Sequence, residues 1–327
     1  NPGASPPFRE FVWRQLRNVA VRDRMMMMAW QEISLDAVRG HDSLALMREW
    51  HGEINRLWIK IARAAKTPDP ENTARSGVDL ILGLLLMVCG LSLAPAEIDA
   101  VFAGNADPSL CWARLPEEAP RQAATGRSSR KADGTRERIL DAAIEVLITE
   151  GPAAIGYRAI AERAHLTTTA PAYYFPTTAG LLEAAQRRLF EDSKARYRDM
   201  MHGARSAEAN VADLTSAIFI REATEFAQVN LANFAIWVEA GRRPQLAPMV
   251  WSAVHDQDIA WRRHLMAARR ERPPLPRDGV LAQALFLGKL QRILSTGSDM
   301  TALAQIRTEF ARDLGAIERG RFWAQRE

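Results

Sequence analysis

Apolar residues recur at three- and four-residue spacing through most of the chain, and the alternating pattern of β-strands is absent. Two apolar stripes stand out, one over residues 80–91 and the other over residues 280–294. Because residues three and four apart share one face of a helix, each stripe predicts a helix with a buried side. The pattern therefore predicts an all-α protein.

A run of short helical patterns lies in the middle of the chain. The spacing predicts one helix over residues 135–150, a second over 157–164 and a third that starts near Thr167. The second and third are joined by Ala164-His165-Leu166, where we expect His165 to adopt the positive φ of a tight turn. A short helix held across another in this way can place its side chains in the major groove of DNA.

Polar side chains suited to DNA contacts gather on the predicted third helix. Small hydroxyl residues at its start can bond phosphates or base edges, and tyrosine hydroxyls one turn later suit phosphates. These candidate residues are Thr167, Thr168, Thr169, Tyr173 and Tyr174. The alternative interpretation is an ordinary three-helix subdomain that makes no DNA contact.

The segment 116–134 has the composition of a linker, because it is poor in apolar residues and rich in Gly, Ser, Pro and charge. Its second half is basic and includes Arg130 and Lys131. Two interpretations stay open here: a solvated tether, or an arm that reaches phosphates or a groove beside the helix-turn-helix.

Residues 135–182 resemble the N-terminal DNA-binding domain of the TetR family of transcriptional regulators. The matching motifs, in the family's order, are TRERILDAAIEVL, EG, RAIAERAHL, YYF and GLLEAA. The resemblance implies an all-α regulator that reads a palindromic operator in double-stranded DNA, together with a helical domain that dimerises and binds a small effector. It places Arg158, Thr167–Thr169, Tyr173 and Tyr174 at positions where such proteins touch DNA. Three residues depart from the family's pattern. His165 replaces the usual turn glycine, Pro171 lies inside the predicted recognition helix, and Ala172 stands where a tyrosine or similar residue is frequent.

The helix-turn-helix is preceded by more than a hundred residues. The order of several residues in this preceding segment recurs after the helix-turn-helix, which suggests an internal repeat. Trp30, His51 and Gly77-Val78 recur in order as Trp237, His255 and Gly279-Val280. We therefore expect four parts: a first TetR-like regulatory domain over 1–115, the basic linker, the DNA-binding domain over 135–190 and a second regulatory domain over 191–327. The interpretation is a tandem fusion of two TetR-like units, the first of which is missing its own helix-turn-helix in this sequence. Its alternatives are one reader with two regulatory bodies, and chance similarity of helical segments.

A tandem fusion has a consequence for assembly. The resemblance implies dimerisation through the last two helices of each regulatory domain, here 74–91 with 95–102 and 279–294 with 301–314. Joined copies can form this four-helix contact within one chain as a pseudo-dimer, and an ordinary homodimer is the alternative.

Aromatic residues and histidines in the two regulatory bodies are the candidates for an effector site. Most such residues are plain core, which is the competing interpretation of each. The candidate effector-binding residues are Phe234, Trp237, Trp251, His255 and Trp261 in the second body, and Trp30 and His51 in the first.

Composition and motifs narrow the remaining function classes. The 327 residues carry 43 basic and 39 acidic side chains, so the net charge of +4 does not by itself indicate nucleic-acid binding. Cys89 and Cys111 lack metal-ligand spacing, so we expect neither a metal nor a cofactor. The motifs GxSxG, HExxH, the P-loop and the Rossmann glycine pattern are absent, which argues against an enzyme.

The expected location follows from these exclusions, and the expected function is what the resemblance to the TetR family implies. The apolar run over 80–91 is too short to span a bilayer, and no signal-peptide pattern follows Asn1, so we expect a cytoplasmic protein. The predicted function is a repressor that a small effector releases from DNA. The alternatives are a helical interaction module that has lost DNA binding, and an all-helical enzyme.

Overall fold

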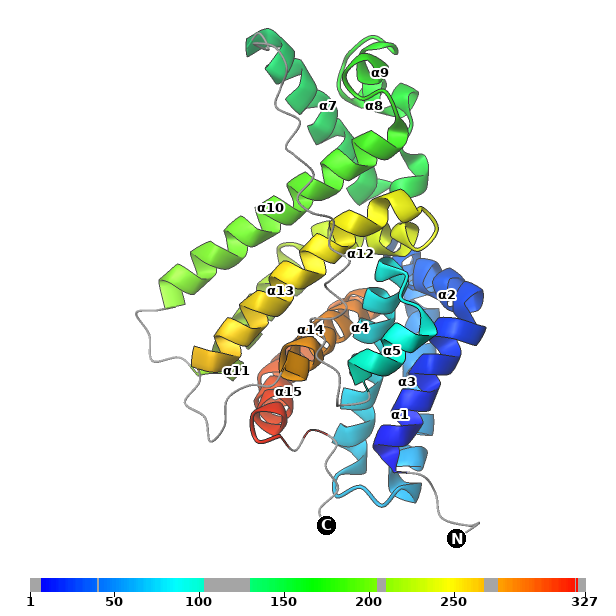
Figure 1. Cartoon of the computed structure of the whole chain (residues 1–327), viewed down its shortest axis with the longest axis vertical. Helices are drawn as coiled ribbons and strands as arrows, with labels where there is room; N and C mark the ends of the chain where they lie inside the picture. The colour runs from blue at the N-terminus through cyan, green and yellow to red at the C-terminus, as the bar shows by residue number, and fades with distance from the viewer. Residues whose placement is uncertain are drawn as a thin grey trace.

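The computed structural model is helical throughout the part of the chain that it describes, which is residues 7–39, 41–102, 130–204, 210–267, 276–320 and 322. No β-strand occurs among these residues. The predicted all-α fold is therefore confirmed, and the basic linker lies outside the described residues up to position 129. Figure 1 shows a helical body from one end of which the helices of residues 130–174 project.

The N-terminal body consists of α1 (Phe8–Arg17), α2 (Arg24–Asp36), α3 (His41–Ala64), α4 (Pro70–Leu91) and α5 (Pro95–Phe102). Helix α4 has clear signals at both ends. The Asp69 side chain accepts a hydrogen bond from the backbone nitrogen of Asn72, and Pro70 supplies the preset φ of a first helical residue. Ser92 ends the helix in the left-handed conformation, with φ of 52°.

The domain that the sequence predicts to bind DNA, called the reader from here on, consists of α7 (Arg130–Thr149), α8 (Tyr157–Arg163) and α9 (Ala170–Tyr174). It has a small core of its own, which is formed by Ile139, Ala142, Ala143, Ile160, Ala164, Phe175 and Leu181. Gly151, with φ of 88°, lies just after the end of α7, where glycine allows the positive φ.

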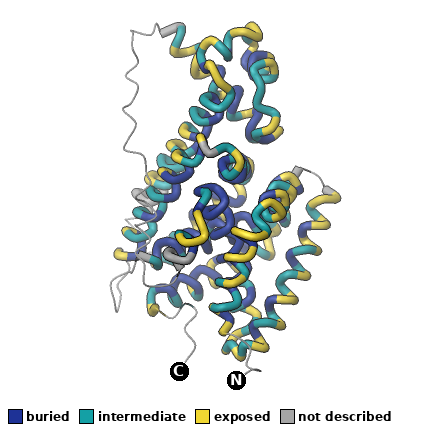
Figure 2. The backbone as a smooth tube through the Cα atoms, turned by 45° about the vertical axis from the view of Figure 1, so that its right-hand side comes forward, coloured by how far each residue is buried: buried dark blue, intermediate teal, exposed yellow. Residues whose placement is uncertain are grey.

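The C-terminal body begins with α10 (Thr178–Ala204), which leads away from the reader (Figure 1). It continues with α11 (Val211–Thr224), α12 (Ala227–Ala240), α13 (Ala247–Ala267), α14 (Pro276–Thr296) and α15 (Met300–Glu318). One apolar core runs through both bodies, and Figure 2 shows the buried positions gathered in the middle of the molecule. The two bodies therefore fold against each other.

Helix α4 is the centre of this core. It is long and apolar enough to cross a membrane by length and composition, yet 94% of its apolar window is buried inside the fold. In this structure it is a core helix, because neighbouring helices cover the surface that a lipid-facing helix would expose.

The two bodies meet along a contact between α4 and α14, called the seam from here on. The backbones touch, because a Cβ on Gly83 would overlap the Ala284 carbonyl and a Cβ on Gly288 would overlap the Asp79 carbonyl. Helices α3 and α13 flank the seam. Helix α5 differs from the predicted four-helix contact, since it packs against α1.

Candidate DNA interface and ligand-binding residues

Helices α7 and α8 are fixed to each other by arginine side chains. Arg163 on α8 reaches Glu145 at 2.7 Å and Glu150 at 2.8 Å, both at the C-terminal end of α7. Arg138 on α7 donates to the Ala164 carbonyl at 2.6 Å, where α8 ends. These contacts set the angle between the two helices that precede the turn.

The turn after α8 has the predicted geometry. His165 has φ of 53°, in the left-handed region that histidine tolerates better than most residues. The backbone nitrogen of Leu166 bonds the Ala161 carbonyl at 2.9 Å, which closes the turn. The histidine that replaces the usual glycine therefore acts as a turn residue.

Helix α9 differs from the prediction at its start. It begins at Ala170, so Thr167–Thr169 form the turn that leads into it. Pro171 is the second helical residue, a position where a missing N–H is tolerated because the first turn has no intrahelical acceptors for its N–H groups. The Tyr157 hydroxyl donates to the Phe175 carbonyl at 2.6 Å and fixes the end of α9 to the start of α8.

The candidate DNA-binding side chains are on the surface of the reader. Arg158, Thr167, Thr168 and Thr169 are exposed, and Tyr173 is 82% exposed. Tyr174 is half-buried and packs edge-on against Tyr173, with ring centroids 5.2 Å apart. An exposed aromatic side chain of this size suits a contact outside the chain.

Arg130 and Lys131 occupy the first turn of α7, which starts five residues before the predicted Thr135. Their side chains lie outside the described parts of the structure. The arm interpretation of the basic segment therefore stays a prediction.

The reader is coupled to the C-terminal body through apolar packing. Leu147 of α7 is fully buried in the main core rather than in the small core of the reader, and Ile144 and Ile148 pack beside that core. Helices α7 and α12 are in contact, and Arg188 of α10 pairs with Glu137 of α7 at 2.8 Å. A shift of α12 or α10 would therefore move the reader.

The structure separates the candidate effector-binding residues into different places. Trp237 and Trp251 are buried against the C-terminal end of α4, where the Trp251 indole donates to the Leu91 carbonyl at 3.2 Å. Phe234 is buried in the same core, and His255 is half-buried on α13. Trp261 packs against Phe286, with ring centroids 5.9 Å apart.

Trp30 and His51 come together in the N-terminal body, with ring centroids 6.4 Å apart. Trp50 stacks on Trp30, and His51 shares a hydrogen bond of 3.1 Å with Ser295 of α14. Several buried polar atoms here have no hydrogen-bond partner among the described residues: Trp30 Nε1, both amide atoms of Gln31, His51 Nδ1 and Gln291 Oε1. Buried polar groups without partners are unusual in folded proteins, so these side chains stand out among the effector candidates.

The pKa of His51 is lowered to about 4. Burial is the larger cause, and the positive charge of Arg292 is the second. Because 6.5 is its ordinary value, the unfolded chain takes up a proton between pH 6.5 and 4 while the folded chain does not. We expect the free energy of unfolding to fall by about 3 kcal/mol over this window. Denaturant titrations from pH 7 to 4 should show a smaller fall in His51→Gln, since carboxylate effects are common to both proteins.

A cluster of buried charges on the seam did not enter the predicted sites. Asp79 of α4 and Lys289 of α14 are fully buried, and Glu309 and Asp313 of α15 lie beside them. The signal in the sequence is Asp79 beside the apolar stripe of residues 80–91, together with Lys289 and Arg292 within the stripe of residues 280–294. Among the described residues, no group of three His, Cys, Asp or Glu side chains could hold a metal ion.

Comparison with known proteins identifies the reader. Residues 139–185 match the family described as bacterial regulatory proteins, tetR family. The search of curated proteins gives no match. Two solved structures match part of the chain. The multidrug binding protein EbrR complexed with imidazole has a TM-score of 0.43 and 26% identity over 54% of this chain and 93% of that one. Salmonella enterica GusR has a TM-score of 0.45 and 17% identity over 59% of this chain and 100% of that one.

Proposed function

We propose that this chain, which carries the DNA-binding domain of TetR-family regulators, is a transcriptional repressor that a small effector releases from its operator. The family match to the reader supports a DNA-binding regulator rather than an enzyme. The observation that supports the finer proposal is the exposed face that carries Arg158, Thr167–Thr169 and Tyr173. It combines hydroxyl donors with a guanidinium group, the groups that contact phosphates and base edges.

The DNA face can be tested by removing two of its side chains. We expect Thr168→Ala combined with Tyr173→Ala to lower operator affinity roughly 10- to 100-fold, because both side chains would contact DNA directly. The fold should be unaffected, since both residues are exposed. Fluorescence anisotropy at low salt, with DNA from upstream of its own gene, measures the affinity. Thr308→Ala, an exposed threonine on α15, is the matched control.

Two results of this titration would count against a DNA-binding role. Wild-type affinity should fall steeply as salt rises, because phosphate contacts release counterions. If the double variant binds as tightly as wild type, this face does not contact DNA. If wild type retards no DNA even at low salt, the alternative of an interaction module that has lost DNA binding is favoured.

The effector response is proposed from the coupling of the reader to α12 and α10. An effector must bind the released conformation more tightly than the DNA-bound one, and a shift of α12 or α10 would then move the reader away from the operator. The cluster of Trp30, Gln31, His51 and Gln291 is the proposed effector site, because its buried polar atoms lack partners among the described residues. Since His51 stays neutral, the site suits an uncharged molecule with hydrogen-bonding groups.

We also propose that the two bodies are tandem copies that pair within the chain. Reciprocal contacts support this. Arg48 of α3 donates to the Thr296 carbonyl at the end of α14 at 2.7 Å, and Trp251 of α13 donates to the Leu91 carbonyl at the end of α4. Each body thus sends a side chain from the helix before its long helix to the end of the other long helix. This pseudo-two-fold arrangement is what a fused dimer would produce.

A further inference from the structure

We propose that buried charges make the seam between α4 and α14 an exclusive pairing, so that neither helix can pair with the same helix of a second copy. The inference rests on the proposed pairing of the two bodies. It concerns which surfaces of this chain can join, and it does not depend on the DNA that the reader binds.

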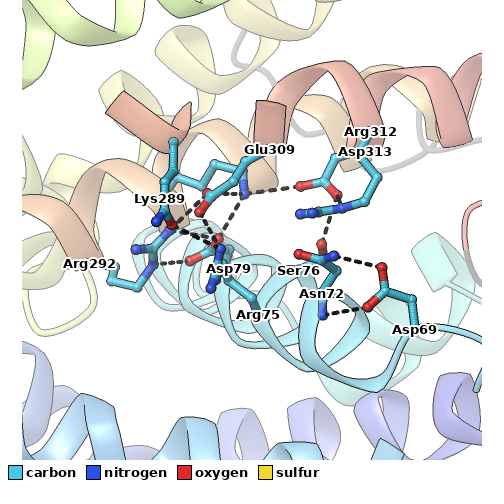
Figure 3. Close-up of polar contacts among 11 residues, drawn as sticks. Asp69, Asn72, Arg75, Ser76, Asp79, Lys289, Arg292, Glu309, Arg312 and Asp313 are labelled. Carbon is cyan, nitrogen blue, oxygen red and sulfur yellow. Dashed lines mark hydrogen bonds and ion pairs between the residues drawn. The ribbon is translucent and has the colours of Figure 1, made fainter. Parts of the chain in front are cut away.

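The charges come from three helices (Figure 3). Lys289 of α14 is fully buried and lies 2.9 Å from Asp79, 3.0 Å from Glu309 and 3.0 Å from Asp313. Arg292, one turn further along α14, holds Asp79 through its Nε at 2.6 Å and Nη2 at 3.1 Å. Asp79 is the carboxylate that α4 contributes, and both of its cations belong to α14.

Two further contacts from α4 reach α15. Arg75 lies 2.9 Å from Glu309, and the Ser76 hydroxyl donates to Asp313 at 2.7 Å. Four polar side chains of α14 and α15 therefore depend on α4 for part of their pairing. A charge buried without a partner is strongly unfavourable, so the network holds only when α4 lies against α14.

The three groups at the centre of the network have no counterparts in the other body. Gly279-Val280 follows Gly77-Val78 by 202 positions, so α4 and α14 can be aligned residue by residue. At the position equivalent to Asp79, α14 has Leu281. At the positions equivalent to Lys289 and Arg292, α4 has Met87 and Gly90. The charged contact is therefore asymmetric although the two bodies are related by a repeat.

This asymmetry decides which pairings are possible. If α4 met α4 of a second copy in the same geometry, each Asp79 would face Met87 and Gly90 and would have no cation. If α14 met α14, Lys289 and Arg292 would face Leu281 and would lose Asp79. The first like pairing buries Asp79 without a cation, and the second leaves Lys289 and Arg292 with only the carboxylates of α15. The unlike pairing satisfies all of these groups, so the charges select against the wrong partner.

The test uses the folded full chain with a protease site inserted in the segment 116–129, which is cut after folding. The two pieces are then held only by the non-covalent contacts between the two bodies, with the seam at their centre. Native mass spectrometry counts the species that form on dilution and reconcentration. We expect one species with one copy of each piece and the mass of the whole chain, 36.5 kDa. Pairs of like pieces from the wild-type protein would overturn the proposal.

A second variant tests whether the charges are the reason. Asp79→Leu with Lys289→Met installs on each helix the residue that stands at the equivalent position of the other. Like pairs should then rise by at least about tenfold, while Met87→Leu, an apolar exchange on the same seam, should leave them unchanged. An unchanged fraction in the double variant would overturn the role of the charges.

If the double variant does not fold, by circular dichroism, the cut wild type still decides whether pairing is exclusive. Operator binding of the same uncut samples is measured separately. Loss of exclusivity with DNA binding intact contradicts this inference alone, and exclusive pairing without DNA binding contradicts the proposed function alone.

Discussion

Replacing Lys289 with methionine is expected to lower the free energy of unfolding by about 3–5 kcal/mol, the range for removing one partner of a buried ion pair. Burial by itself would lower the pKa of Lys289, but the carboxylates of Asp313, Asp79 and Glu309 outweigh burial and raise it above its ordinary value. Lys289 is therefore charged in the fold. Its removal leaves three buried carboxylates with fewer cations, and methionine offers them no hydrogen bond.

A lysine-to-methionine substitution at an exposed ion pair is the control for Lys289→Met, because it removes the same charged group without the burial. Lys194 pairs with Asp256 at 2.9 Å across α10 and α13, but its side chain is 39% exposed. Lys194→Met should cost less than about 1 kcal/mol, because water screens an exposed pair and solvates the remaining carboxylate. Urea titrations of both variants at pH 7 measure the difference. Equal losses would show that the seam network contributes no more than a surface ion pair.

The reader could be predicted closely from sequence because its signals are local. The apolar spacing placed the first two helices, and the positive φ of His165 follows from the shortness of the turn. The start of α9 was predicted three residues too early, since threonines suit a helix start by their capping chemistry. Pro171 was the better signal, because proline is favoured in the first turn of a helix and therefore places the start beside it.

The seam charges could be predicted only in part. A lone aspartate beside one apolar stripe and a lone lysine within another indicate buried charges that need partners. The pairing itself joins Asp79 and Lys289 across 210 positions of the chain, and no local pattern specifies such a contact. The same limit applies to the aromatic candidates. Trp237 and Trp251 pack against the end of α4, which their helical spacing alone does not reveal.

The glycines of the seam give the second large effect. Gly83→Ala combined with Gly288→Ala is expected to lower the free energy of unfolding by about 3–6 kcal/mol, at the upper end of overpacking costs for two sites. Each new methyl group would overlap a backbone carbonyl of the opposite helix, Ala284 in one case and Asp79 in the other. A backbone atom cannot rotate away as a side chain can, so α4 and α14 must separate and the buried ion pairs must lengthen.

The sign of the change in the free energy of unfolding is informative, because Gly→Ala stabilises a helix at positions where no neighbouring atom obstructs the new methyl group. Alanine exceeds glycine by about 1 kcal/mol in helix propensity, so Gly52→Ala with Gly134→Ala should raise the free energy of unfolding by up to about 2 kcal/mol. Gly52 lies in α3 with only the end of the Arg56 side chain within 4 Å, and Gly134 lies in α7 with nothing within that distance. Urea titration of both double variants should give shifts of opposite sign. A stabilised seam variant would mean that α4 and α14 do not meet backbone to backbone, and the tight register on which the charge network depends would then be wrong as well.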